Sequence, residues 1–161
     1  MGIIIKEIAP SQYGKCVDVI RRAFAPVADR FSLTEHGCPT NPAFVKLERL
    51  IFEADNGVDM YGVFKDDVQI GFVGLDKREN EMKLEKLCIV PEQCGNGYGT
   101  LLLEFAKDKA RKMGYKKISL GVIAQNMELR EWYKANGFSE MSVRSFELLP
   151  FEVCMMQMEL I

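Results

Sequence analysis

The sequence has little of what a metal site or a disulfide framework requires. It contains one histidine, His36, and five cysteines, which are odd in number and never spaced as C-x-x-C. Structural zinc sites combine Cys and His at short spacings, and disulfide frameworks pair an even number of cysteines. We therefore expect no metal ion, no disulfide framework and five free thiols.

Long apolar runs and a strong net charge are lacking too. No apolar run approaches the length of a membrane span, and the first residues lack the basic leader and cleavage site of a signal peptide. The net charge is −2 at pH 7, and the basic residues within 107–112 alternate with apolar helix positions, as a solvated helix face does. We expect a soluble, cytoplasmic protein that binds neither membranes nor nucleic acid.

The 161 residues, 48% of them hydrophobic, suit a single domain over residues 1–161, since neither a linker nor a repeat interrupts them. Periodicity and turn residues predict the order β-α-α-β-β-β-α-β-α-β-β. The expected strands are 3–7, 60–65, 68–77, 82–90, 117–122, 139–148 and 153–161, and the expected helices are 11–25, 42–54, 101–113 and 127–135. Asn41 is expected to cap the second helix, and Asp66-Asp67 to form a hairpin turn.

The most informative segment is residues 90–103, where an apolar strand passes through a glycine-spaced turn into an amphipathic helix. Gly95, Gly97 and Gly99 permit positive φ angles and leave no Cβ in the way. Successive backbone N–H groups can then meet an anion at the helix N-terminus, where the helix dipole also favours negative charge. The segment therefore predicts a phosphate-binding turn.

Spacing excludes two familiar nucleotide loops. The dinucleotide pattern G-x-G-x-x-G fails from Gly95 and from Gly97, because its third glycine would fall at Thr100 or at Leu102. The P-loop also fails, because no Gly-Lys-Ser or Gly-Lys-Thr occurs in the chain.

A second segment lies downstream at residues 121–138. Asn126 is a good helix N-cap, and Tyr133 lies on the same helical face as Leu129. Gly137, followed by Phe138, is expected to end that helix in the left-handed conformation.

Together these two segments resemble the paired motifs of the GNAT superfamily of acyl-CoA N-acyltransferases. The first motif is Q/R-x-x-G-x-G/A, which Gly97 and Gly99 match while Cys94 replaces the usual Arg or Gln. Asn126, Tyr133, Gly137 and Phe138 match the second motif, and the resemblance is most specific over residues 82–138. It implies a single α/β (α+β) domain with a mixed, mostly antiparallel sheet of about seven strands and four helices.

The resemblance also implies acetyl-CoA as co-substrate and an amine as acceptor. The acyl-pantetheine arm would pair with main-chain groups of the 82–90 strand where that strand parts from the 117–122 strand. The residues assigned to the coenzyme are the strand residues Cys88, Ile89 and Val90, the loop residues Cys94, Gly95, Asn96, Gly97, Tyr98, Gly99 and Thr100, and Asn126. In the resembled family the pyrophosphate is bound mainly by main-chain N–H groups. Cys94 in place of Arg or Gln is therefore expected to lower the affinity for the coenzyme rather than to change which coenzyme binds.

Acetyl transfer to an amine needs a base for the attacking nitrogen and an acid for the leaving thiolate. The resemblance assigns the acid role to Tyr133, and we interpret Glu85 as the base because alternation places it on the apolar face of Leu87 and Ile89, where desolvation would make it more basic. A plain surface glutamate is the alternative. A backbone N–H near Ile89 or Val90 is expected to hold the carbonyl oxygen. Direct transfer is favoured over a covalent Cys88 intermediate, since nothing places His36 beside Cys88.

Substrate selection in the resembled family rests on the first helices and the loop between them. Phe31 and His36 are therefore candidate acceptor-binding residues, with a solvated loop histidine as the alternative for His36. The sequence leaves open whether residues 146–151 line the acceptor pocket or form a contact in a homodimer.

The leading hypothesis is an acetyl-CoA-dependent N-acetyltransferase acting on a small amine or a protein amino group by direct transfer in a ternary complex. One rival is a catalytically silent sensor that binds CoA or acetyl-CoA, a hypothesis that the Cys94 departure supports and the intact Tyr133 opposes. The other rival is a structural or interaction protein in which both glycine segments only shape the scaffold.

Overall fold

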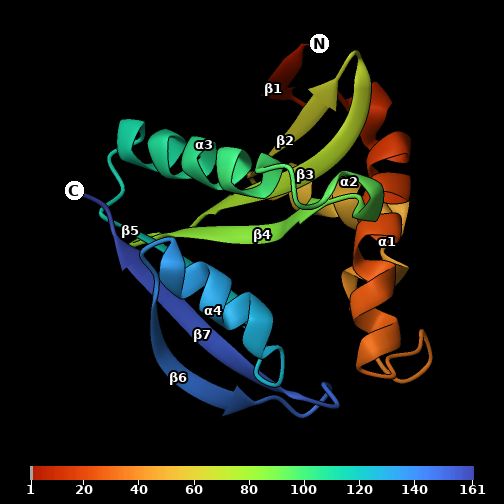
Figure 1. Ribbon diagram of the computed structural model, residues 1–161, viewed down its shortest axis with the longest axis vertical. Helices are drawn as coiled ribbons and strands as arrows, with labels where there is room; N and C mark the ends of the chain where they lie inside the picture. The colour runs from red at the N-terminus through yellow and green to blue at the C-terminus, as the bar shows by residue number, and fades with distance from the viewer. Residues whose placement is uncertain (1) are drawn as a thin grey trace.

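The structure is a computed structural model that describes residues 2–161, and it is built around a seven-stranded sheet in the order β1-β2-β3-β4-β5-β7-β6 (Figure 1). The strands are β1 Ile3–Glu7, β2 Val58–Lys65, β3 Val68–Lys77, β4 Met82–Ile89, β5 Lys117–Ile123, β6 Ser139–Ser145 and β7 Glu152–Glu159. The helices are α1 Tyr13–Arg30, α2 Leu47–Asp55, α3 Tyr98–Lys112 and α4 Met127–Ala135. Among the strand pairs of residues 2–161 only β4–β5 is parallel, so the predicted mixed, mostly antiparallel sheet with four helices is confirmed.

The second predicted helix differs most from the structure. Residues Pro42–Phe44 form a separate 3₁₀ turn, which Asn41 caps by accepting a hydrogen bond from the Ala43 N–H at 3.0 Å. Val45 and Lys46 are then extended, with ψ angles of 143° and 158°, so α2 begins only at Leu47. The prediction of one helix from residue 42 is wrong because the Asn41 cap closes a single turn.

Two smaller boundaries also differ. Helix α1 continues to Arg30 and includes Pro26, whereas the sequence predicted an end near residue 25. Strand β6 ends at Ser145, and residues 146–151 form the connection to β7. The hairpin turn is confirmed, since Asp66 and Asp67 have φ angles of 48° and 69°, as a type I′ turn requires.

Separate cores lie on the two faces of the sheet. One contains Cys16 and Ile20 of α1, Leu50 of α2, and Phe72 and Cys88 of the sheet. The other packs α3 and α4 against the opposite face, through residues that include Leu102, Leu103, Ala106, Ala110 and Tyr133. Strand β4 therefore separates an α1–α2 face from an α3–α4 face.

A buried lysine ties α3 to the end of α4. Lys107 is 4% exposed, and its Nζ donates hydrogen bonds to the Asn136 carbonyl at 2.6 Å and to Glu104 at 2.8 Å. Asn136 is the C-cap of α4, so this contact satisfies a helix-end carbonyl that would otherwise lack a donor.

We predict that Lys107→Ala lowers the free energy of unfolding by about 2 kcal/mol, because a charge-assisted hydrogen bond is lost and a carbonyl is left unsatisfied. Urea denaturation measures the change. Lys112→Ala, at an exposed position of the same helix, is the control and should change stability by no more than about 0.5 kcal/mol. Equal effects of the two substitutions would contradict the prediction.

Candidate functional site

Strands β4 and β5 are paired only at their beginnings. Their parallel ladder consists of Met82 opposite Ile118 and Lys83 opposite Ser119, although β4 runs on to Ile89. Beyond that point β5 continues its pairing with β7 alone, and the two strands diverge (Figure 1). We call this divergence the β4–β5 splay. Main-chain groups of β4 that face it have no strand partner in the described chain, so an extended amide-bearing ligand can satisfy them.

The ladder on the other side of β4 shows which main-chain groups face the splay. The Val90 N–H donates to the Ile70 carbonyl of β3 at 2.9 Å. In an antiparallel ladder alternate residues point their N–H and C=O groups to opposite sides, so Cys88 shares the direction of Val90 and Ile89 faces the splay. Of the three strand residues assigned from sequence, Ile89 is the one whose main chain is available.

The glycine turn leads directly into α3. Gly95 and Gly97 have φ angles of 86° and 83°, and Gly97 is the N-cap of the helix. Gly99 instead lies in the first helical turn, and it is not one of the glycines with a positive φ in residues 2–161. A Cβ there would meet the Trp132 ring at 3.6 Å, an ordinary contact, so packing within the protein does not require glycine at this position.

The turn offers a run of backbone donors. Within residues 2–161, no hydrogen bond engages the N–H groups of Gly95, Asn96, Gly97, Tyr98, Gly99 and Thr100, and no side chain caps the helix. The first N–H to be used is that of Leu101, which donates to the Gly97 carbonyl at 3.0 Å. The Cys94 N–H is also occupied, because it donates to the Pro91 carbonyl at 3.2 Å. Six of the seven predicted loop donors are therefore free to bind an anion.

Helix α4 forms as the sequence predicted. The Asn126 side chain accepts a hydrogen bond from the Leu129 N–H at 3.2 Å, which makes it the N-cap. Gly137 follows the helix with a φ of 99°, the left-handed terminator. Tyr133 is 5% exposed, and its ring packs edge-on against Trp132 and Phe138 at centroid distances of 4.9 and 5.5 Å. The cap and the aromatic contacts together fix the position of the Tyr133 ring.

The Tyr133 hydroxyl is the reactive end of this buried ring. It makes no hydrogen bond within residues 2–161. Burial raises the pKa of Tyr133 well above its ordinary value, and the neighbouring Cys88 raises it further. The phenol therefore stays protonated at neutral pH and can serve as a proton donor.

Cys88 is unsuited to carrying an acyl group. It is buried on the α1–α2 face, and burial raises the pKa of its thiol far above the usual range. Because the thiolate is the nucleophilic form, a thiol kept neutral is inert. His36 lies in the exposed loop after α1. Cys88 therefore lacks the features of an acyl carrier.

The predicted face of Glu85 is wrong. Strand β4 has one extra residue opposite β3, because Phe72 pairs with Cys88 while Gly74 pairs with Glu85. Lys86 takes up the extra residue with a φ of 56°, so alternation shifts by one. Glu85 lies on the α1–α2 face, whereas Leu87 and Ile89 pack against the α3–α4 core.

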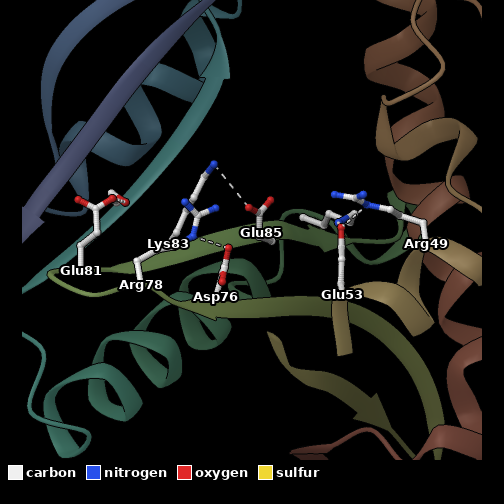
Figure 2. A network of polar contacts seen from close by, with 9 residues as sticks. Arg49, Glu53, Asp76, Arg78, Glu81, Lys83 and Glu85 are labelled. Carbon is white, nitrogen blue, oxygen red and sulfur yellow. Dashed lines mark hydrogen bonds and ion pairs between the residues drawn. The ribbon is translucent and has the colours of Figure 1, made fainter. Parts of the chain in front are cut away.

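Glu85 is accessible rather than desolvated. Its side chain is 28% exposed and lies 3.6 Å from the Lys83 ammonium (Figure 2). It lines a hollow of about 270 Å³ together with Arg49 and Phe52 of α2, and with Arg78, which follows β3. A carboxylate at such a surface can accept a proton from an amine or from a bridging water.

A second hollow, of about 260 Å³, lies between the loop after α1, the residue before Asn126 and the connection before β7. Its lining consists of Phe31, Ser32, Leu33, Thr34, Gly37, Cys38, Gln125, Pro150 and Phe151. Phe31 lines this hollow, as do Pro150 and Phe151 of the 146–151 segment, while His36 lies outside its lining. Gln125 was missed, although its place directly before the motif residue Asn126 was a usable signal.

No group of three or more His, Cys, Asp or Glu residues within 2–161 is placed to hold a metal ion. The cysteines are free thiols, of which Cys94 is exposed. None of the helices in residues 2–161 has the length and apolarity to span a membrane.

Solved structures with the same fold include several acetyltransferases. PaiA N-acetyltransferase from Thermoplasma acidophilum, in complex with coenzyme A, superposes with a TM-score of 0.84 and 22% identity over 99% of each chain. The ribosomal-protein-S18-alanine N-acetyltransferase from Escherichia coli gives a TM-score of 0.79 at 16% identity over 99% of this chain and 94% of that one. A GNAT family acetyltransferase from Elizabethkingia anophelis, with acetyl-CoA bound, gives 0.68 at 16% identity over 98% of each chain.

Sequence comparison gives the family directly. A search of curated proteins found no match. The family model described as "Acetyltransferase (GNAT) family" matches residues 28–138, which is more than half of the chain and includes both glycine segments, the β4–β5 splay and Tyr133. This chain therefore belongs to the GNAT family of acetyltransferases.

Proposed function

We propose that this protein transfers an acetyl group from acetyl-CoA to the primary amine of a small molecule or a protein, by direct transfer in a ternary complex. The observation that carries the proposal is the continuity between the β4–β5 splay and an uncapped helix N-terminus with free N–H groups from Gly95 to Thr100. An arm with amides can pair along β4 while its pyrophosphate meets the N-terminus of α3.

The chemistry follows from the groups around the splay. Acetyl-CoA supplies an acyl group activated as a thioester. Glu85 removes a proton from the acceptor ammonium, directly or through water, so that the nitrogen can attack the carbonyl carbon. The Ile89 N–H donates to the carbonyl oxygen as that oxygen gains negative charge. As the carbon–sulfur bond breaks, Tyr133 gives its proton to the leaving thiolate.

The hollow lined by Phe31 and Phe151 is the proposed site for the unreactive part of the acceptor. It lies beside the end of β5, where the strands have parted, and none of its nine lining residues carries a charge. An amine with a neutral, partly aromatic body fits this lining better than a polycation, which needs carboxylates. An acceptor panel should therefore pair phenylalkylamines with polyamines and peptides.

We predict that acetyl-CoA raises the melting temperature and that at least one amine of the panel releases free CoA thiol. A ligand that binds only the native state stabilises it by about 2.7 kcal/mol at 100 times its dissociation constant. Differential scanning fluorimetry and a thiol assay measure the two effects. Absence of any shift at saturating acetyl-CoA would overturn the proposal. A shift without turnover on any amine would instead identify a silent CoA-binding module.

A further inference from the structure

Lys86 adopts a backbone conformation that a lysine rarely takes. Its φ is 56°, in the left-handed region, and it is the extra residue of the bulge in β4. Nothing in the local sequence favours this, since lysine has no side-chain hydrogen bond to offer its own backbone as Asn or Asp does. A contact from elsewhere in the fold must hold it.

That contact is an ion pair with α2. The Lys86 Nζ lies 2.7 and 2.8 Å from the two carboxylate oxygens of Glu53, and both side chains are only 9% exposed. Arg49, one turn earlier on α2, adds a hydrogen bond to the same carboxylate at 2.8 Å (Figure 2). Glu53 thus receives two cations, and its partners reach it from a helix and from the bulge.

A buried ion pair is a weak source of stability compared with apolar side chains of the same size, but it is directional. Both Glu53 oxygens accept from one ammonium, which fixes where the Lys86 side chain points relative to α2. The pair therefore constrains the geometry of the β4 backbone more than it adds to the core.

The bulge decides which face of the sheet Glu85 occupies. Without the extra residue, alternation would put Glu85 with Leu87 and Ile89 on the α3–α4 face. With it, Glu85 faces α2 while Ile89 keeps its main chain toward the splay. The last pair between β4 and β5 involves Lys83, so the strands separate just before the bulge.

We propose that the Lys86–Glu53 ion pair positions the reacting groups: it holds the β4 bulge so that Glu85 stays on the α1–α2 face while the Ile89 N–H faces the β4–β5 splay. This inference rests on the proposed acetyl transfer. Lys86 and Glu53 are positioning residues, since neither is required to touch a substrate. The loop at residues 95–100 makes no contact with Lys86, Glu53 or Arg49, so the pyrophosphate contacts should survive the loss of the pair and coenzyme binding should suffer less than turnover.

The test compares Lys86→Met, which keeps length but removes the charge, with Lys86→Arg, which can still pair with Glu53. Turnover per folded molecule should fall about tenfold or more in Lys86→Met, because small misplacements of reacting groups lower the rate strongly. Lys86→Arg should keep much of the wild-type turnover. The dissociation constant of acetyl-CoA should change by less than about threefold. Lys77→Met, which removes an ion pair with Asp59 at 3.0 Å elsewhere on the sheet, is the control. Glu53→Gln gives the same comparison if Lys86→Met does not fold.

Amide hydrogen exchange of the 82–90 segment provides a readout that needs no turnover. Exchange should accelerate in Lys86→Met and stay unchanged in Lys77→Met if the pair holds the bulge. If the wild type is active and Lys86→Met has the same turnover, the positioning role is overturned. It is also overturned if Lys86→Met loses acetyl-CoA affinity by the same factor as turnover. Both results leave the proposed function standing. A wild type that binds acetyl-CoA but acetylates no amine overturns the proposed function, and the positioning role with it.

Discussion

Tyr133→Phe should lower turnover by about 100-fold or more while leaving the affinity for acetyl-CoA nearly unchanged. The substitution removes one hydroxyl and keeps the ring that packs against Trp132 and Phe138. Because that hydroxyl has no partner within residues 2–161, its loss leaves no unsatisfied group in the protein. The effect should therefore appear in turnover and hardly at all in stability.

The measurement is steady-state kinetics at saturating acceptor, with acetyl-CoA affinity taken from calorimetry. Tyr115→Phe is the matched control, because Tyr115 also packs against the α3–α4 core but lies outside the site. Since the pKa of Tyr133 is raised by burial, wild-type turnover should not fall through loss of its proton between pH 7 and about 10, the ordinary tyrosine value. Turnover of Tyr133→Phe within twofold of the wild type, as a rough limit, would remove Tyr133 from the acid role.

The parts of the site that could be predicted from sequence depend on local chemistry. Asn126 caps α4 and Gly137 ends it because a short polar side chain and a missing Cβ act on neighbouring backbone groups. The turn at Gly95 and Gly97 follows the same logic, and so does the hairpin at Asp66-Asp67. Each of these signals is complete within a few residues.

The parts that could not be predicted depend on contacts between distant segments. Alternation failed at Glu85 because the bulge at Lys86 is held by Glu53, which lies 33 positions earlier in the chain. The Cys94 N–H was counted as a phosphate donor, but the 3₁₀ turn Pro91–Gln93 ends by using it. Residues 95–100 are therefore the part of this loop whose N–H groups are unused within residues 2–161.

Thr100→Glu should therefore separate helix stability from coenzyme affinity. Thr100 is the third residue of α3, exposed, with a free N–H. A carboxylate in the first turn interacts favourably with the helix dipole, by about 0.3–1 kcal/mol, so the free protein should become slightly more stable. The same carboxylate competes with pyrophosphate for the N–H groups and repels its charge.

Two unit charges about 5 Å apart repel by about 3 kcal/mol at an effective dielectric constant near 20, and solvent screening reduces this. We expect acetyl-CoA to bind about 30-fold more weakly or worse, measured by calorimetry, with a melting temperature equal to or above that of the wild type. Thr100→Gln has nearly the same size without the charge and should keep most of the affinity. If Thr100→Glu bound acetyl-CoA as tightly as Thr100→Gln, the pyrophosphate could not lie at the α3 N-terminus, because no arrangement there would leave a new carboxylate without effect.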